Sequence, residues 1–90
     1  MKEKRDDILD IQKDRLNGIY MRAKVFHEKK IPIHISASRN GLKFFYNGEI
    51  KELNNDFLML QERKLGLLPI FLIEIYDIEK FGGNPNGKKD

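Results

Sequence analysis

The sequence predicts a mainly β protein with an N-terminal α-helix, in which five short strands form one small, strongly bent antiparallel barrel. Residues 31–81 contain short apolar runs separated by turn signals, two of which include Asn-Gly. Residues 1–30 are highly charged and carry apolar residues at helical spacing, whereas residues 82–90 are polar. We therefore expect a helical arm (1–30), a β-barrel (31–81) and a disordered tail (82–90).

Composition limits the class of protein. Ninety residues suit a single domain, and the absence of cysteine excludes disulfides and Cys-based zinc sites. No apolar run is long enough to span a bilayer, and the charged N-terminus has no apolar signal core. These features predict a cytoplasmic protein without a membrane partner.

The positive charge is concentrated in the arm. The net charge is +3, and residues 1–30 hold nine Lys and Arg against six Asp and Glu. Residues 31–81 hold six basic residues against seven acidic ones. The expected β unit alone is therefore a weak candidate for holding a polyanion by charge.

Helical periodicity runs from residue 3 to about residue 29. Apolar residues recur at heptad spacing: Leu9, Leu16 and Ala23 at one position, Ile19 and Phe26 at the other. This stripe favours packing on a core, with a coiled-coil partner as the alternative. Asn17-Gly18 is a point where the helix could break, since Gly is unfavourable inside helices. A strand over residues 19–25 is the less favoured alternative.

The first two strands follow from alternation and turn chemistry. Ile31, Ile33 and Ile35 alternate with other residues, which places them on one face of a strand. Asn40-Gly41 then supplies a hairpin turn. Residues 42–53 form either two strands joined at Asn47-Gly48 or one long strand bent sharply at Gly48.

The remaining strands are more apolar. Residues 57–62 alternate, with Leu58 and Leu60 on one face and Phe57 and Met59 on the other. Residues 67–75 are apolar on both faces and predict a strand with a second face covered by the helix or by another subunit. A short closing strand is expected over residues 76–81.

A helix followed by five short strands, with the second bent at a Gly, resembles the Sm-like family. This family includes the Sm and Lsm proteins, the bacterial RNA chaperone Hfq and small archaeal relatives. Residues 48–60 resemble the first Sm motif, in which Gly, spaced apolar residues and an Asp/Asn turn lead into an apolar strand. The resemblance covers residues 31–81.

This resemblance implies RNA binding by a homo-oligomeric ring. In such rings, the fourth strand of one subunit pairs with the fifth strand of the next, so no strand edge is left free. The RNA-binding residues that we expect are Arg39, Asn40, Asn54, Asn55, Asp56, Phe57, Arg63 and Lys64. Six of them are turn residues that we expect to cluster on one rim of the barrel: Arg39, Asn40, Asn54, Asn55, Arg63 and Lys64. The oligomer interface that we expect is Leu68, Ile70, Phe71, Leu72 and Ile73.

Three positions depart from the family pattern. Asn54 replaces the usual Asp of the first motif, and Leu58 stands where Sm proteins have a base-binding Asn. Glu74 lies near the position of the RNA-contacting cation of the second motif. These departures leave a second hypothesis open, in which the chain is an SH3-like module that binds a protein and not nucleic acid.

No arrangement of residues indicates catalysis. His27, His34 and nearby carboxylates could hold a metal, but histidines in structural or solvated positions explain them better. Ser36 and Ser38 beside His34 do not form a triad, because neighbouring positions on a strand lack its geometry. Tyr46 and Phe57 are candidate stacking faces for an unpaired base. We expect neither an enzyme nor a cofactor.

Overall fold

The computed structural model describes the backbone of residues 2–82 and the side chains of residues 13–82. Helix α1 (Lys2–Lys29) is followed by strands β1 (Ile33–Arg39), β2 (Leu42–Leu53), β3 (Phe57–Glu62) and β4 (Gly66–Phe71). A 3-10 turn, η1 (Leu72–Glu74), leads into β5 (Ile75–Lys80). The sequence therefore predicted a mainly β chain with an N-terminal helix correctly. The tail expected over 82–90 lies outside the described residues, except for Gly82.

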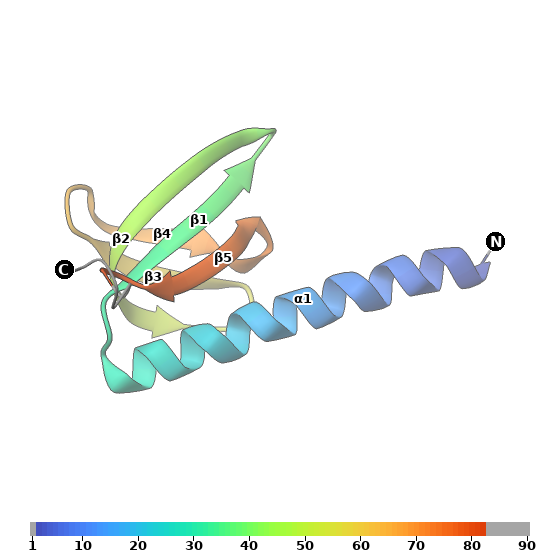
Figure 1. The fold of residues 1–90 in the computed structure, drawn as a ribbon, viewed down its shortest axis with the longest axis horizontal. Helices are drawn as coiled ribbons and strands as arrows, with labels where there is room; N and C mark the ends of the chain where they lie inside the picture. Colours follow the sequence, from blue (N-terminus) through green and yellow to red (C-terminus); the bar gives the residue numbers. More distant parts are fainter. Residues whose placement is uncertain (1, 83–90) are drawn as a thin grey trace.

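The strands form one antiparallel sheet with the order β4-β3-β2-β1-β5 (Figure 1). Every neighbouring pair is antiparallel, and three of the four pairs, β1–β2, β2–β3 and β3–β4, are joined by short turns. Strands β4 and β5 are the two edges, so the sheet is not closed by pairing between them.

Strand β2 bends at Gly48 instead of turning back on itself. Its first half pairs with β1 and its second half with β3, and Gly48 is the residue that pairs with both Ile33 and Glu62. The alternative of one long bent strand is therefore correct, and the alternative of a hairpin turn at Asn47-Gly48 is wrong. Because the two halves face different strands, the bend curves the sheet around a core.

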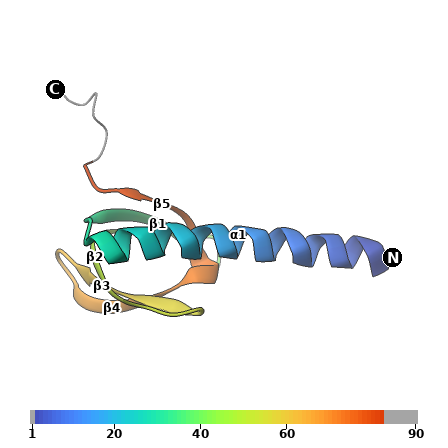
Figure 2. The ribbon, with the colours of Figure 1, turned by 90° about the horizontal axis from the view of Figure 1, so that it is seen from below.

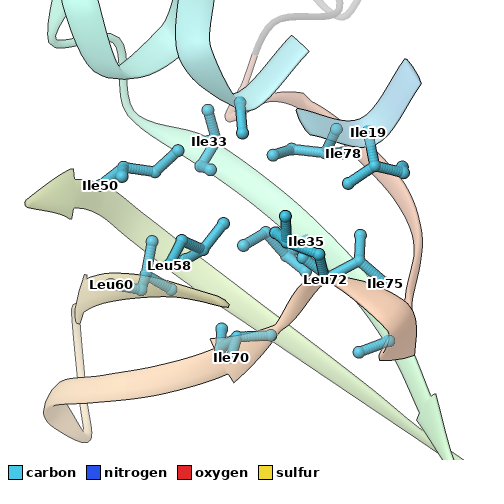
Figure 3. Packing of buried hydrophobic residues seen from close by; sticks show 12 residues of the cluster. Ile19, Ile33, Ile35, Ile50, Leu58, Leu60, Ile70, Leu72, Ile75 and Ile78 are labelled. Atoms are coloured by element: carbon cyan, nitrogen blue, oxygen red, sulfur yellow. The ribbon is translucent and has the colours of Figure 1, made fainter. Parts of the chain in front are cut away.

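The core is built mainly from isoleucine and leucine. The fully buried side chains are Ile33, Ile35, Ile50, Leu58, Leu60, Leu72, Ile75 and Ile78. Ile19 from α1 lies at one side of this core and Ile70 from β4 at the other (Figure 3). The alternation predicted for residues 57–62 is confirmed, because Leu58 and Leu60 point inward.

Helix α1 is continuous through Asn17-Gly18, so the break considered there does not occur, nor does a strand over residues 19–25. The C-terminal half of the helix packs on the sheet, and its N-terminal part extends beyond it (Figures 1 and 2). Ile19 and Ala23 are buried, and Leu16, Tyr20 and Phe26 pack against the core. The apolar stripe at these positions is therefore explained by core packing.

Several strand boundaries differ from those predicted, and β5 spans Ile75–Lys80 where residues 76–81 were expected. β1 begins at Ile33, not Ile31, because the amide of Ile31 donates a hydrogen bond to the Phe26 carbonyl at the helix end. The apolar run 67–75 is not one strand, because it ends as β4 at Phe71 and continues as η1. The amide of Leu72 donates to the carbonyl of Asp56, and this contact holds the chain in the turn.

Candidate nucleic-acid interface

The eight residues expected to bind RNA lie at two ends of the fold. Asp56 immediately precedes β3 and Arg63 immediately follows it, so these two residues lie at opposite ends of one strand. The expectation that the six turn residues among them share one rim is therefore wrong for Arg63 and Lys64. The other six belong to the β1–β2 and β2–β3 turns.

The β1–β2 and β2–β3 turns are both held to η1. The Arg39 guanidinium donates two hydrogen bonds to the Glu74 carboxylate, at 2.9 and 3.0 Å. This carboxylate raises the pKa of Arg39, so the guanidinium is charged but already paired. The side-chain oxygen of Asn54 accepts from the amides of Asp56 and Phe57, at 2.8 and 2.9 Å, and shapes the β2–β3 turn.

These contacts limit what the turn residues can offer to a ligand. Arg39 is neutralised by Glu74, and the Asn54 side chain is occupied by its own turn. Phe57 meets Phe71 edge to face, with ring centroids 6.0 Å apart, and is half-buried. Asn55 lines a hollow of about 300 Å³ that it shares with Lys13, Leu16, Asn17 and Tyr20 of α1.

Helix α1 also holds η1. The Arg15 guanidinium donates to the carbonyls of Ile75 and Ile73, at 2.8 and 3.1 Å. Arg22 lies 3.7 Å from Asp77 of β5, with both side chains about half exposed. Part of the arm's positive charge therefore stabilises the helix–sheet contact, and such a cation is less available to an external polyanion.

The opposite end of the fold contains a larger cleft, which we call the β3–β4 cleft. Its volume is about 560 Å³, and its lining comprises Phe45, Asn47, Glu62, Arg63, Lys64 and Phe81. A neighbouring hollow of about 480 Å³ shares Glu62, Arg63 and Phe81 with it. Only Arg63 and Lys64 of this lining were expected from the sequence.

Glu62 organises the base of the β3–β4 cleft. Its side chain accepts hydrogen bonds from the amides of Asn47, Lys64 and Leu65, at 3.0, 2.7 and 2.9 Å. These backbone hydrogen bonds, led by the one from Asn47, lower the pKa of Glu62. The carboxylate thus fixes the β3–β4 turn against the middle of β2.

We expect Glu62→Gln to destabilise the fold at neutral pH. An amide offers one acceptor oxygen instead of two and turns an NH2 group toward a backbone N–H. Because the folded pKa lies below the ordinary value of 4.5, the carboxylate's contribution is complete above pH 4.5 and is lost as the pH falls through the folded pKa.

Thermal unfolding of the wild type and Glu62→Gln between pH 3 and pH 8 checks this expectation. The two midpoints should converge as the pH falls below 4.5. Exposed Glu52→Gln is the matched control and should show no such convergence. A pH-independent difference for Glu62→Gln would contradict the role assigned to the carboxylate.

Aromatic side chains near the β3–β4 cleft differ in exposure. Phe45 is 58% exposed, whereas Tyr46, one of the two stacking candidates from the sequence, is half-buried and stacks on Phe44. Alternation within Phe44-Phe45-Tyr46 could have identified Phe45, because consecutive strand residues point to opposite faces. Phe81 is 37% exposed, and the Arg63 guanidinium carbon lies 4.9 Å from its ring centroid.

Both histidines have structural partners. His27 Nδ1 donates to the carbonyl of Ile50 at 3.1 Å, since a carbonyl oxygen can only accept. His34 Nδ1 lies 2.6 Å from the side-chain oxygen of Asn47, and its ring stacks on Phe45. Across the part of the chain that the structure describes, no three His, Cys, Asp or Glu residues are grouped as a metal site would need.

The expected interface residues divide between the core and the surface. Ile70 and Leu72 are 2% and 1% exposed and belong to the core of the single chain, and Leu68 packs against that core. An exposed role for Ile70 and Leu72 is therefore excluded in this fold. Phe71 and Ile73 are 46% and 65% exposed and remain accessible.

No family model, curated protein or solved structure matches the chain. In the helix described here, no segment is both long and apolar enough to cross a membrane.

Proposed function

We propose that the chain is an Sm-like subunit that assembles side by side into a homo-oligomeric ring and binds single-stranded RNA as a chaperone or scaffold. The observation that carries the assembly is an apolar outer face beside an edge strand. Leu67, Pro69 and Phe71 of β4 point away from the core, and Phe57 and Met59 of β3 pair with two of them. We call these five residues the β3–β4 outer face.

This outer face is open within one chain. Leu67 is 56% exposed, and α1 packs mainly on β2, β5 and η1. Ile73 of η1 and Tyr76 of β5 add exposed apolar surface near the other edge, at 65% and 44%. Exposed apolar surface next to a free strand edge is typical of an interface, since a protein that left it open would tend to aggregate.

Strand pairing gives the assembly a direction. Within the described residues, β4 pairs only with β3, and β5 pairs only with β1. Pairing β4 of one copy with β5 of the next joins two different edges, and such a contact repeats around a ring when the rotation closes. A closed ring leaves no edge unpaired, and it completes the barrel-like packing that the resemblance implies.

Two features support the proposed RNA binding. The first is the resemblance, and the second is a pair of cationic side chains that make no ion pair with a carboxylate within the described residues. Arg63 and Lys64 lie in the β3–β4 turn beside exposed aromatic rings. Cations hold phosphates without regard to sequence, and aromatic rings stack on unpaired bases. Repetition of one such site around a ring would raise the affinity for a strand long enough to reach several subunits.

Native mass spectrometry, with and without an unstructured oligoribonucleotide, tests both parts. We expect the wild type to form a closed oligomer that gains mass on adding RNA. Leu67→Glu should shift the population to monomer, because it places a charge on the β3–β4 outer face. Leu42→Glu is the matched control, since Leu42 is similarly exposed, at 64%, but lies in the central strand β2.

Two results would overturn the proposal. A wild-type monomer at micromolar concentration would remove the ring, and an oligomer without RNA binding would remove the RNA function. A monomer that captures a protein partner would instead support the SH3-like interaction module. The net negative charge of residues 31–81 suits that second function.

A further inference from the structure

The β3–β4 cleft combines aromatic rings and cations at one opening. Phe45 comes from the first half of β2 and Phe81 follows β5, so residues far apart in sequence form its walls. Arg63 and Lys64 belong to the turn between β3 and β4. The amide of Arg63 donates to the Asn47 carbonyl at 2.8 Å, which ties that turn to the middle of β2. The geometry of the opening is thus set by the backbone.

Phe45 is an exposed ring with a fixed orientation. It is 58% exposed, and the His34 ring lies nearly parallel to it, with an interplanar angle of 11° and a centroid separation of 5.9 Å. His34 is itself held by Asn47 at 2.6 Å. An aromatic ring held in this way can receive a planar ligand at little further cost in side-chain entropy.

The opening of the cleft is cationic although its base holds a carboxylate. Arg63 and Lys64 are exposed, whereas Glu62 is 7% exposed and accepts three backbone N–H bonds. Those amide dipoles already compensate the Glu62 charge. Glu49, which lines the adjoining hollow, lies 3.8 Å from Lys51. An incoming anion therefore meets Arg63 and Lys64 first.

A ligand that uses the whole cleft must be both planar and anionic. We infer that the β3–β4 cleft holds one nucleotide of single-stranded RNA, with the base against Phe45 and Phe81 and the phosphate at Arg63 and Lys64. An acidic peptide would satisfy the cations but would leave the two rings without a planar partner. The inference rests on the proposed RNA function and specifies its site, which lies away from the β2–β3 turn and η1.

Binding of a labelled uridine or adenosine hexanucleotide, followed by fluorescence anisotropy, tests the inference. Phe45→Ala should weaken binding about fivefold or more, as expected for the loss of one stacked base. Arg63→Ala should weaken binding and reduce the salt dependence by about one counterion. The matched controls are Leu42→Ala, an exposed apolar residue of the same strand, and Lys24→Ala, an exposed helix cation.

The outcomes separate this site from the proposed function. If Phe45→Ala and Arg63→Ala reduce RNA binding no more than the controls do, the assignment of the nucleotide to the cleft is wrong. The proposed RNA function would be unaffected by that result. If the wild type binds no RNA, titration with uridine monophosphate by NMR decides the cleft alone. Chemical-shift changes confined to the amides of Asn47, Lys64 and Leu65 would support nucleotide binding in the cleft. No shift changes, or the same changes caused by an acidic peptide and not by uridine monophosphate, would overturn it.

Discussion

Replacing Gly48 by Ala should destabilise the fold by about 3 kcal/mol or more, because the new methyl group has no space. A Cβ on Gly48 would overlap the Gln61 carbonyl oxygen and lie 2.8 Å from its carbon and 3.0 Å from the Glu62 Cα. These are backbone atoms of the paired strand β3, so no side-chain rotation can relieve the clash. The two strands would have to separate at the bend.

Thermal and urea unfolding followed by circular dichroism measure this effect. For a chain of this size, about 3 kcal/mol corresponds to a fall in Tm of more than roughly 10 °C. Gly18→Ala is the matched control, since apart from its chain neighbours and the local helix backbone no atom lies within 4 Å of the added Cβ, and the site is inside α1. That change should raise stability by up to about 1 kcal/mol, through helix propensity.

The signs of the two changes distinguish the roles of the two glycines. A Gly48→Ala variant as stable as the wild type would mean that β2 does not bend against Gln61. It would also remove the physical reason for curvature of the sheet at this residue. A destabilising Gly18→Ala would mean that α1 is not a continuous helix through residue 18.

A mainly β chain with an N-terminal helix and five antiparallel strands could be predicted because its signals are local. Asn40 and Gly41 have positive φ values of 53° and 81°, as a tight hairpin turn requires. The Asn-Gly pair indicates this turn in the sequence. Alternation likewise predicted the inward faces of Leu58 and Leu60. Local signals of this kind describe single turns and strands, and they were sufficient for the order of the elements.

The 3-10 turn could not be predicted, because Leu72-Ile73-Glu74 contains no Gly, Pro or Asn. Its conformation follows from distant contacts: the Asp56 carbonyl, the Arg15 guanidinium and the Arg39 guanidinium. Leu72 and Ile75 are buried in the core, so the turn is as apolar as the strand before it. In the sequence, this apolar run is indistinguishable from one continuous strand over residues 67–75.

The candidate site was predicted only in part, for a similar reason. Arg63 and Lys64 were identified as turn cations, but their neighbour Phe45 comes from β2 and Phe81 follows β5. Which aromatic residue reaches a given turn depends on strand order and on the bend, not on the spacing in the chain. Arg39 was expected to bind RNA, and only the fold places Glu74 against it.

The second large effect is expected at Leu58, where the resembled Sm motif has a base-binding asparagine. Leu58 is fully buried and pairs with Leu53 and Ile70. Truncating a buried leucine to alanine costs about 2–5 kcal/mol, and a buried amide without partners adds a further penalty of about 1–3 kcal/mol. Leu58→Asn should therefore consume most of the stability of a small domain, about 5 kcal/mol at the lower end of the usual range.

Urea unfolding of Leu58→Asn beside Leu42→Asn tests this expectation. Leu42 is 64% exposed and lies outside the β3–β4 outer face, so its substitution should cost much less. If Leu58→Asn folds with wild-type stability and binds RNA more tightly, residue 58 faces a ligand and the inward orientation of Leu58 is wrong. If Leu58→Asn unfolds, the side chain at position 58 belongs to the core and cannot contact a ligand. Under the proposed RNA function, an unpaired base would then bind elsewhere on the chain, which favours the exposed rings of the β3–β4 cleft.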